Sequence, residues 1–406
     1  METEGKKNQL ITIALGLFFI FSNIASHTIY ESISLLFLMT IGIIYILKTK
    51  KIYGSIYFGL YLIFIIYHII LILNGTAINK DVSYSMLQTL GINVIILIFV
   101  YNLIIHYKDF KGFSKVYVMS TIISLLLIIF LQRDTLLTGR LAHSYGEDSI
   151  SYYFLGQAVS ISANSISFSC AVSAALSIYL SKMEKKKSFL IYGFLLCIGV
   201  ILTGSRKGIL ILALLLLATI NLIYKKNIIK KVLFLICGGL LLWFLIMKIP
   251  AFYNILGERL LELINKILGY STTEGSIIAR ERYKNFAFEM INNSPLYGYG
   301  LGYFKYLYGN VTESNYLEMI VSGGIIGLIL YYISLIPIFV KYFLQKNKND
   351  LLKLFFLIFI SILIIDYGSV TYFSRSYVIF YVIILAILRL VKHDSNNNIH
   401  QIESKQ

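Results

Sequence analysis

The chain has 406 residues, of which 58% are hydrophobic and only 14% are charged, and its formal net charge is +16. A soluble fold of this size could not bury so much apolar material, so the composition excludes a soluble globular protein. Because the positive residues lie in short connections between apolar segments, the charge indicates control of membrane topology and not nucleic-acid binding.

Apolar segments recur along the chain at about the 20-residue length with which a helix crosses a hydrocarbon core about 30 Å thick. They do not show the alternation typical of a membrane β-barrel. The sequence therefore predicts an all-α integral membrane protein with about 12 transmembrane helices. The predicted spans are 10–29, 32–47, 52–73, 87–106, 115–132, 153–180, 188–203, 208–224, 231–249, 314–341, 351–367 and 375–391.

Lysines mark alternate connections, from Lys6 and Lys7 before the first span to Lys392 after the last. Because cytoplasmic loops carry an excess of lysine, both termini are expected in the cytoplasm and the protein in the cytoplasmic (inner) membrane. The first span has no small-residue cleavage site and is expected to be retained. The predicted organisation is spans one to nine in 1–249, an extracytoplasmic loop in 250–313, spans ten to twelve in 314–391 and a cytoplasmic tail in 392–406.

Arginine follows the opposite pattern. Seven of the eight arginines lie on the extracytoplasmic connections or at that end of a span, against the usual charge rule. A guanidinium group binds phosphate or carboxylate through two hydrogen bonds at once, which favours an anionic ligand on this face. The alternative is that these arginines form ion pairs with nearby acids or contact lipid head groups. The seven are Arg133, Arg140, Arg206, Arg259, Arg280, Arg282 and Arg375.

The turn between the seventh and eighth spans reads ILTGSRKGILIL and places Arg206 and Lys207 between Gly204 and Gly208. Two cations on so short a connection, beside main-chain donors at a helix start, would suit an anionic head group. The alternative is a basic turn whose side chains reach lipid phosphates.

The long loop contains a segment with helical periodicity at 276–295. Its apolar residues fall at i, i+3, i+4, i+7 and i+8, so we expect a helix that lies against the membrane domain. Arg280 lies at the edge of the apolar stripe and Arg282 farther toward the polar side, which makes Arg280 the stronger candidate for a site. The alternative is an ion pair, with Arg280 and Lys284 facing an acid elsewhere. The stripe is Tyr283, Phe286, Ala287, Met290 and Ile291.

The next stretch, PLYGYGLGYFKYLYG, places Gly298 and Gly300 among tyrosines. Glycines at this spacing allow the main chain to approach a ligand closely, and tyrosines offer flat faces to sugar rings. Tyrosine belts at the membrane interface would also explain many of these aromatic residues.

The tenth span opens with TESNYLEMIVSGGIIGL. Asn315 and Glu318 have the spacing of a helix capping box, whereas Glu313 and Glu318 are also carboxylates placed where a general base could act. Gly323 and Gly327 form a small-xxx-small pair that favours helix packing. The three cysteines lie in apolar segments without metal-ligand spacing, so we expect them to be core residues.

Three features in order resemble the superfamily of O-antigen ligases and Wzy-type polysaccharide polymerases. They are TGSR at 203–206, Arg280 fifteen residues before P-x-x-G-x-G at 295–300, and S-N-Y-L-E at 314–318 followed by GGIIGL. They cover about residues 203–330, and the span layout with one large loop extends the likeness along the chain. The resemblance implies a lipid-linked glycan donor and acceptor, carried on undecaprenyl diphosphate, at the extracytoplasmic face.

The resemblance also implies site residues. Arg206 and Arg280 would bind the diphosphate and stabilise the leaving group while an acceptor hydroxyl attacks the anomeric carbon. Glu313 and Glu318 stay the candidates for a catalytic base because of their position next to the arginine-rich loop. No metal or cofactor is expected, because arginine would take the cation's role. The remaining candidates for substrate binding are Lys207, Arg282, Arg375, Gly298, Gly300, Ser314 and Asn315.

Two positions depart from the family pattern. Ser314-Asn315 stands where ligases typically have a His-Asn pair, and Lys284 stands where a tryptophan often follows the loop arginine. The missing histidine favours a polymerase of O-antigen, capsular or exopolysaccharide repeat units, working beside flippase and chain-length regulator proteins. The alternatives are a ligase that transfers finished glycan to a terminal acceptor and a flippase for lipid-linked sugars.

Overall fold

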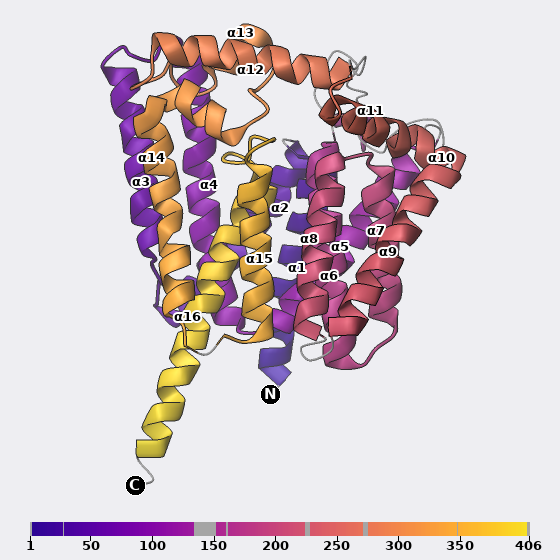
Figure 1. Cartoon of the computed structure of the whole chain (residues 1–406). Helices are drawn as coiled ribbons and strands as arrows, with labels where there is room; N and C mark the ends of the chain where they lie inside the picture. The colour runs from indigo at the N-terminus through magenta and orange to yellow at the C-terminus, as the bar shows by residue number, and fades with distance from the viewer. Residues whose placement is uncertain are drawn as a thin grey trace. The chain divides into compact units, whose positions relative to one another are not determined.

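The computed structural model describes residues 2–26, 28–133, 152–159, 161–223, 228–270, 275–346 and 348–403 (Figure 1). Arg140 lies outside these residues. The chain divides into two compact units, one formed by Met1–Leu38 and Asp109–Gly275 and the other by Met39–Lys108 and Ser276–Gln406.

The prediction of a helical integral membrane protein is confirmed. Within the described residues, seven helices are long and apolar enough to cross a membrane, and two shorter apolar helices accompany them at Gln9–Ile24 and Ser188–Leu202. The total of twelve spans stays a prediction. The seven are α2 (Ile29–Thr49), α3 (Ile56–Leu73), α4 (Lys80–Tyr107), α5 (Phe110–Leu131), α6 (Ala163–Glu184), α8 (Arg206–Ile223) and α14 (Asn315–Leu344).

The first unit is built around α6, which packs against α5, α7 (Ser188–Leu202) and α8. Small residues line α6 and let its neighbours approach closely. A Cβ at Gly208 of α8, for example, would lie 2.4 Å from the Cβ of Ser167. Hydroxyl groups join α6 to its neighbours, as where Ser173 Oγ donates to Thr121 Oγ1 at 2.8 Å. The unit also contains α1 (Glu2–Ile24), α9 (Ile228–Lys248), α10 (Pro250–Phe252), the π-helix η1 (Tyr253–Gly257) and α11 (Glu258–Ile267).

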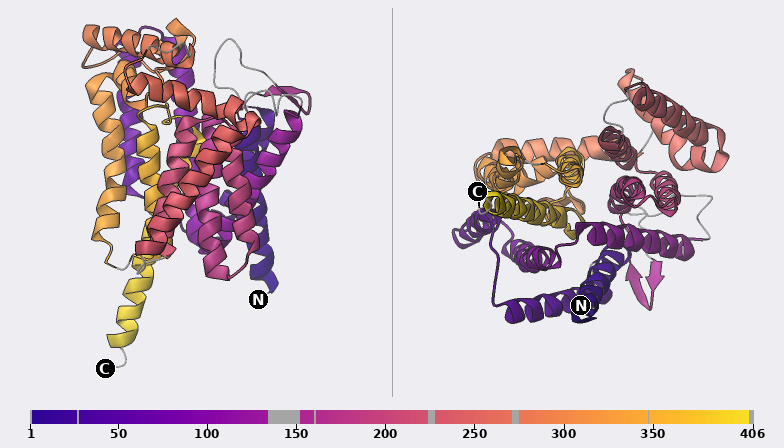
Figure 2. Two further views of the ribbon diagram at one scale, coloured as in Figure 1. Left: turned by 45° about the vertical axis from the view of Figure 1, so that its right-hand side comes forward. Right: turned by 90° about the horizontal axis from the view of Figure 1, so that it is seen from below.

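The span predicted at 153–180 is wrong at its start. A two-stranded antiparallel hairpin, β1 (Tyr152–Phe154) and β2 (Gln157–Val159), occupies its first residues, and the helix begins only at Ala163. Leu155 and Gly156 adopt positive φ and close the hairpin turn. The hairpin lies beside the start of α2, where the Tyr30 hydroxyl donates to the Leu155 carbonyl at 2.6 Å (Figure 2). An apolar composition alone did not distinguish this hairpin from the first turns of a helix.

The second unit packs α3 against α14, and α16 (Arg375–Glu403) against α4 and α15 (Asp350–Ile365). Gly323 and Gly327 of α14 face α3, since a Cβ at either position would lie within 4 Å of the Tyr67 ring. The expected packing role of this pair is confirmed. The remaining helices of the unit are α12 (Gly275–Asn293) and α13 (Tyr303–Tyr308).

Helix α14 is broken at Gly324, whose φ of 65° and ψ of −170° are not helical. The loop at 295–300 fills the break with main-chain hydrogen bonds: Tyr299 N donates to Val321 O at 2.8 Å, and Ile325 N donates to Pro295 O at 2.9 Å. Gly298, with φ of +66°, makes this approach possible, because a Cβ there would lie 2.5 Å from Val321 O. The loop thus pairs main-chain groups that the break would leave buried and unpaired.

Candidate functional site

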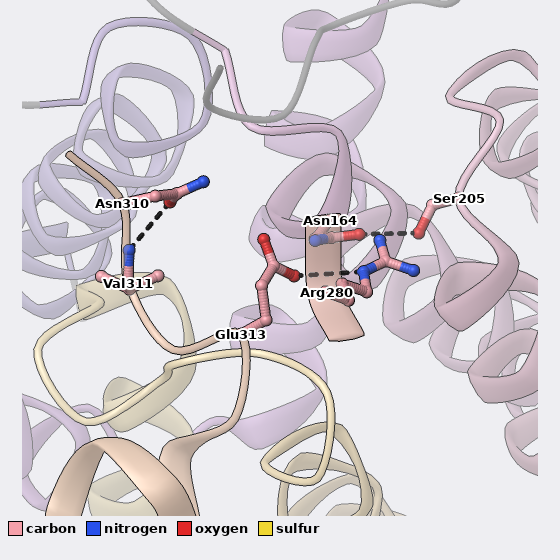
Figure 3. A network of polar contacts seen from close by, with 6 residues as sticks. All are labelled: Asn164, Ser205, Arg280, Asn310, Val311 and Glu313. Carbon is pink, nitrogen blue, oxygen red and sulfur yellow. Dashed lines mark hydrogen bonds and ion pairs between the residues drawn. The ribbon is translucent and has the colours of Figure 1, made fainter. Parts of the chain in front are cut away.

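The 203–208 turn is ordered by its own side chains. Ser205 N donates to Thr203 Oγ1 at 3.3 Å, Gly208 N donates to Ser205 Oγ at 3.2 Å, and Gly204 adopts a φ of +60°. Ser205 Oγ donates in turn to Asn164 Oδ1 at 3.0 Å (Figure 3). Helix α8 begins at Arg206, so this arginine stands at the positive end of the helix dipole. An anion at this helix start would meet both the guanidinium and the main-chain donors.

Arg206 and Arg259 are joined by crossed hydrogen bonds. Arg206 Nη1 donates to the carbonyl of Arg259 at 3.3 Å, and Arg259 Nη1 donates to the carbonyl of Gly204 at 2.8 Å. Both residues are half-buried, as is Lys207 beside them. The first turn of α11 is therefore held against the 203–206 turn, and two guanidinium groups come together there. The sequence placed Arg259 among the extracytoplasmic arginines but gave no reason to choose it.

Arg280 and Glu313 form an ion pair in the second unit. Arg280 Nε lies 3.4 Å from Glu313 Oε2, with 35% and 23% of the two side chains exposed (Figure 3). Glu313 has a φ of +62°, which costs a residue other than glycine about 1–3 kcal/mol and often marks functional positions. The structure thus brings together two residues that the sequence offered separately, one as a phosphate ligand and one as a base. An ion pair with a distant acid was the alternative left open for Arg280.

The apolar stripe of the helix at 276–295 packs as expected. Its five residues form one cluster with buried Phe304 of α13 and Val321 of α14, so α12 lies against the helices of its own unit. Arg282 is exposed, and its guanidinium lies 5.3 Å from the centre of the Phe286 ring. Arg280 is the more enclosed of the two arginines, in agreement with the sequence prediction.

The start of α14 differs from the predicted capping box. Ser314 is the N-cap residue and Asn315 is the first residue of the helix. Glu318 is 1% exposed, and its Oε2 accepts a hydrogen bond at 3.1 Å from the main-chain N of Thr312, two residues before the cap. The predicted capping box was wrong, because the Asn315 side chain accepts hydrogen bonds from the main chain of Thr371 and Tyr372 and does not cap the helix.

Asn315 joins the start of α14 to the connection between α15 and α16. Its Oδ1 accepts from the main-chain N of Thr371 and of Tyr372, each at 3.1 Å. Its own main-chain N donates to the carbonyl of Asp366 at 2.7 Å, and Ser314 Oγ donates to the same carbonyl at 3.3 Å. These contacts give Ser314 and Asn315 a positioning role next to Glu313.

Asp366 is a buried carboxylate that the sequence did not place in the site. It lies just beyond the end of α15 and accepts hydrogen bonds from the hydroxyl groups of Tyr332, at 2.9 Å, and Thr371. Asn315 Nδ2 lies 3.5 Å from Asp366 Oδ2, so the carboxylate is also linked to the start of α14. Its position at a span end was the only signal in the sequence.

The other predicted residues make contacts inside the second unit. Arg375 Nε donates to Asn93 Oδ1 of α4 at 2.9 Å. Gly298 and Gly300 approach the protein itself, since a Cβ at Gly300, with φ of +99°, would lie 2.6 Å from Ser83 Oγ. Their expected role beside a ligand stays a prediction.

Stacked tyrosine rings follow the glycine loop. The rings of Tyr299 and Tyr303 lie 5.7 Å apart at 7°, and those of Tyr303 and Tyr306 lie 6.2 Å apart at 26°. Tyr306 is 60% exposed. Such a row offers flat apolar faces with polar edges, which is the chemistry that sugar rings need.

Comparison with known families identifies a segment that contains many of these residues, whereas Asp366 and Arg375 lie beyond it. Residues 191–332 match the family model Wzy_C, described as O-Antigen ligase. This segment is similar to the O-antigen ligase family. The matched segment contains Arg206, Arg259, Arg280 and Glu313, and the resemblance drawn from the three sequence features is confirmed. No curated protein matches the chain.

Proposed function

We propose that the protein is a metal-independent glycosyltransferase that polymerises oligosaccharide repeat units carried on a polyprenyl diphosphate at the outer face of the cytoplasmic membrane. The observation that carries the proposal is the pair of guanidinium groups of Arg206 and Arg259 beside the start of α8, within the segment that matches the O-antigen ligase family. Arginines at a helix start at the end of a membrane span suit the phosphates of a lipid-linked donor.

In the proposed reaction, an acceptor hydroxyl oxygen attacks the anomeric carbon of the donor glycan. The bond from that carbon to the phosphate oxygen breaks, and the lipid diphosphate leaves with the bonding electrons. Arginine charge stabilises the diphosphate as it leaves, and the proton of the hydroxyl passes to a base. Glu313 is the candidate base, and its side chain is partly exposed beside Arg280.

The glycan would be bound by aromatic faces. Tyr299, Tyr303 and Tyr306 present stacked rings beside α12, the helix that carries Arg280. We propose that sugar rings lie on this row, while Ser314, Asn315 and Asp366 hold the start of α14 and thereby Glu313 in place.

The function is tested by the lipid-linked and surface glycans of a deletion strain. A polymerase is supported if the strain accumulates single repeat units and a plasmid copy restores long chains, whereas the Arg206→Ala copy at equal protein level does not. Unaltered long-chain polymer in the deletion strain would contradict the proposal.

A ligase is the second candidate, because the matching family is described as O-Antigen ligase. Transfer of finished glycan to a terminal acceptor needs the same donor chemistry and the same arginines. In that case the deletion strain would contain long polymer that remains lipid-linked and unattached. The same gel therefore separates the two activities.

A further inference from the structure

Helix α11 has two distinct faces. At 100° per residue its apolar side chains occupy one side of the helix and its polar side chains the other. The apolar side consists of Leu260, Leu261, Leu263, Ile264 and Ile267, continued by Leu268, and the polar side consists of Glu258, Arg259, Glu262, Asn265 and Lys266.

One end of α11 is held by its own unit. Ile255 and Leu256, just before the helix, form a buried cluster with Ile201 at the end of α7 and Ile246 near the end of α9, and Leu260 packs against this cluster. The helix therefore begins over the ends of α7 and α9 (Figure 1).

The depth of α11 relative to a membrane follows from Arg259. Its Nη1 donates to the carbonyl of Gly204, in the turn immediately before α8. Helix α8 is an 18-residue candidate span that starts at Arg206, so the whole helix is needed to cross the hydrocarbon core. The 203–205 turn must then lie at a membrane surface, and the first turn of α11 lies at the same level.

The C-terminal part of the apolar side is exposed among the residues that the structure describes. Ile267 is 75% exposed, Leu268 66% and Ile264 38%, and Tyr270 just beyond is 66% exposed. Such a group of exposed apolar residues marks an interaction surface, and at the level of a membrane surface the adjacent apolar phase is the acyl-chain region of the leaflet.

We propose that α11 is a membrane-surface helix whose Ile264, Ile267 and Leu268 insert into the lipid leaflet at the end of the bundle that carries the 203–206 turn. Its partner is the bilayer itself, at the boundary between head groups and acyl chains. Tyr270 suits the same depth, because tyrosine is enriched at membrane interfaces. Insertion would hold Arg259 at the level of lipid phosphates. The membrane contact does not depend on the proposed enzymatic activity.

The experiment uses fluorescence, because the chain has a single tryptophan, Trp243. In a Trp243→Phe background, tryptophan is introduced at Ile267 or Leu268, with Asn265→Trp on the polar side of the same helix as the matched control. Full-length protein is reconstituted into phosphatidylcholine vesicles, with or without bromine atoms on the acyl chains close to the head group. Monodisperse elution before reconstitution shows that each variant is folded, and the two apolar positions serve as replicates of one another.

Insertion predicts blue-shifted emission at 267 and 268 and quenching by brominated lipid at least twofold stronger than at 265. Equal quenching at all three positions, or emission typical of water at 267 and 268, would overturn the proposal. Blue-shifted emission at 267 and 268 that brominated lipid does not quench, but that changes with the protein-to-lipid ratio, would also overturn the proposal. It would indicate contact with a second copy of the chain. Neither result depends on glycan synthesis, so failure here leaves the proposed function standing.

Discussion

The two arginine regions of the molecule hold their guanidinium groups in different ways. In the first unit, Arg206 and Arg259 donate to main-chain carbonyl groups, which orient a guanidinium without cancelling its charge. In the second unit, Arg280 pairs with the carboxylate of Glu313, which offsets part of that charge. An anionic ligand at Arg280 must compete with this carboxylate. The first region offers the start of α8 together with Arg206 and Lys207, so we expect it to contribute more to phosphate binding than the second.

The largest expected effect comes from Arg206→Ala. Loss of a charged donor that stabilises a developing anion lowers a rate by about 100- to 1000-fold, and we expect a decrease of that size in glycan transfer. Arg280→Ala should lose less, because Arg280 lies in the second turn of α12 and not at a helix start, and because it already pairs with Glu313. Both variants are compared with wild type in proteoliposomes that contain purified lipid-linked substrate. A larger loss of transfer rate for Arg280→Ala than for Arg206→Ala would show that the second region contributes more to phosphate binding.

Arg259→Ala tests whether the crossed hydrogen bonds matter. It removes the donor to the Gly204 carbonyl and one of the two guanidinium groups. The loss of a hydrogen bond from a charged donor, about 1.5 kcal/mol or more, corresponds to at least a tenfold lower rate. Arg259→Lys should recover only part of it, since lysine lacks the forked donor geometry. If the Arg259→Ala enzyme had the wild-type rate, Arg259 would not contribute to catalysis and Arg206 would be the important arginine of the pair.

Glu313→Gln distinguishes two possible roles of Glu313, as the ion-pair partner of Arg280 and as the general base. If Glu313 only pairs with Arg280, the amide releases the guanidinium at little cost and the rate should stay within about threefold, because partly exposed ion pairs contribute about 1 kcal/mol or less. If Glu313 is the general base, as proposed, the rate should fall by about 100-fold or more. The control is Glu313→Gln combined with Arg280→Ala, since only a pairing role makes the two losses strongly non-additive.

The smallest effect concerns Asp366, which holds the chain next to Glu313. Its carboxylate accepts hydrogen bonds from the hydroxyl groups of Tyr332 and Thr371. Asp366→Asn replaces one acceptor oxygen by an amide that cannot accept, so we expect the free energy of unfolding to fall by about 1 kcal/mol and the melting temperature by about 2 °C. An unchanged melting temperature would show that these hydrogen bonds do not stabilise the fold.

The sequence predicted a large part of what matters for function. Apolar length and the lysine pattern indicated a helical membrane protein, and glycines beside Arg206 and Lys207 indicated the tight turn before α8. The periodicity at 276–295 identified both the helix α12 and the side on which it packs. These features are local: periodicity, caps and turn residues act over a few positions, so neighbouring residues are enough to reveal them.

Only the tertiary structure paired residues that are far apart along the chain. Arg280 meets Glu313 33 positions away, and Arg259 meets Gly204 55 positions away. The Asp366 network and the main-chain bonds that fill the break in α14 likewise depend on which loops come together. No local pattern specifies the partner of a polar side chain, because that partner is set by how the helices pack. Composition and spacing thus determined the class of molecule and the turn that bears Arg206, whereas packing decided that Arg280 meets the carboxylate of Glu313 and that Arg206 and Arg259 meet main-chain carbonyl groups.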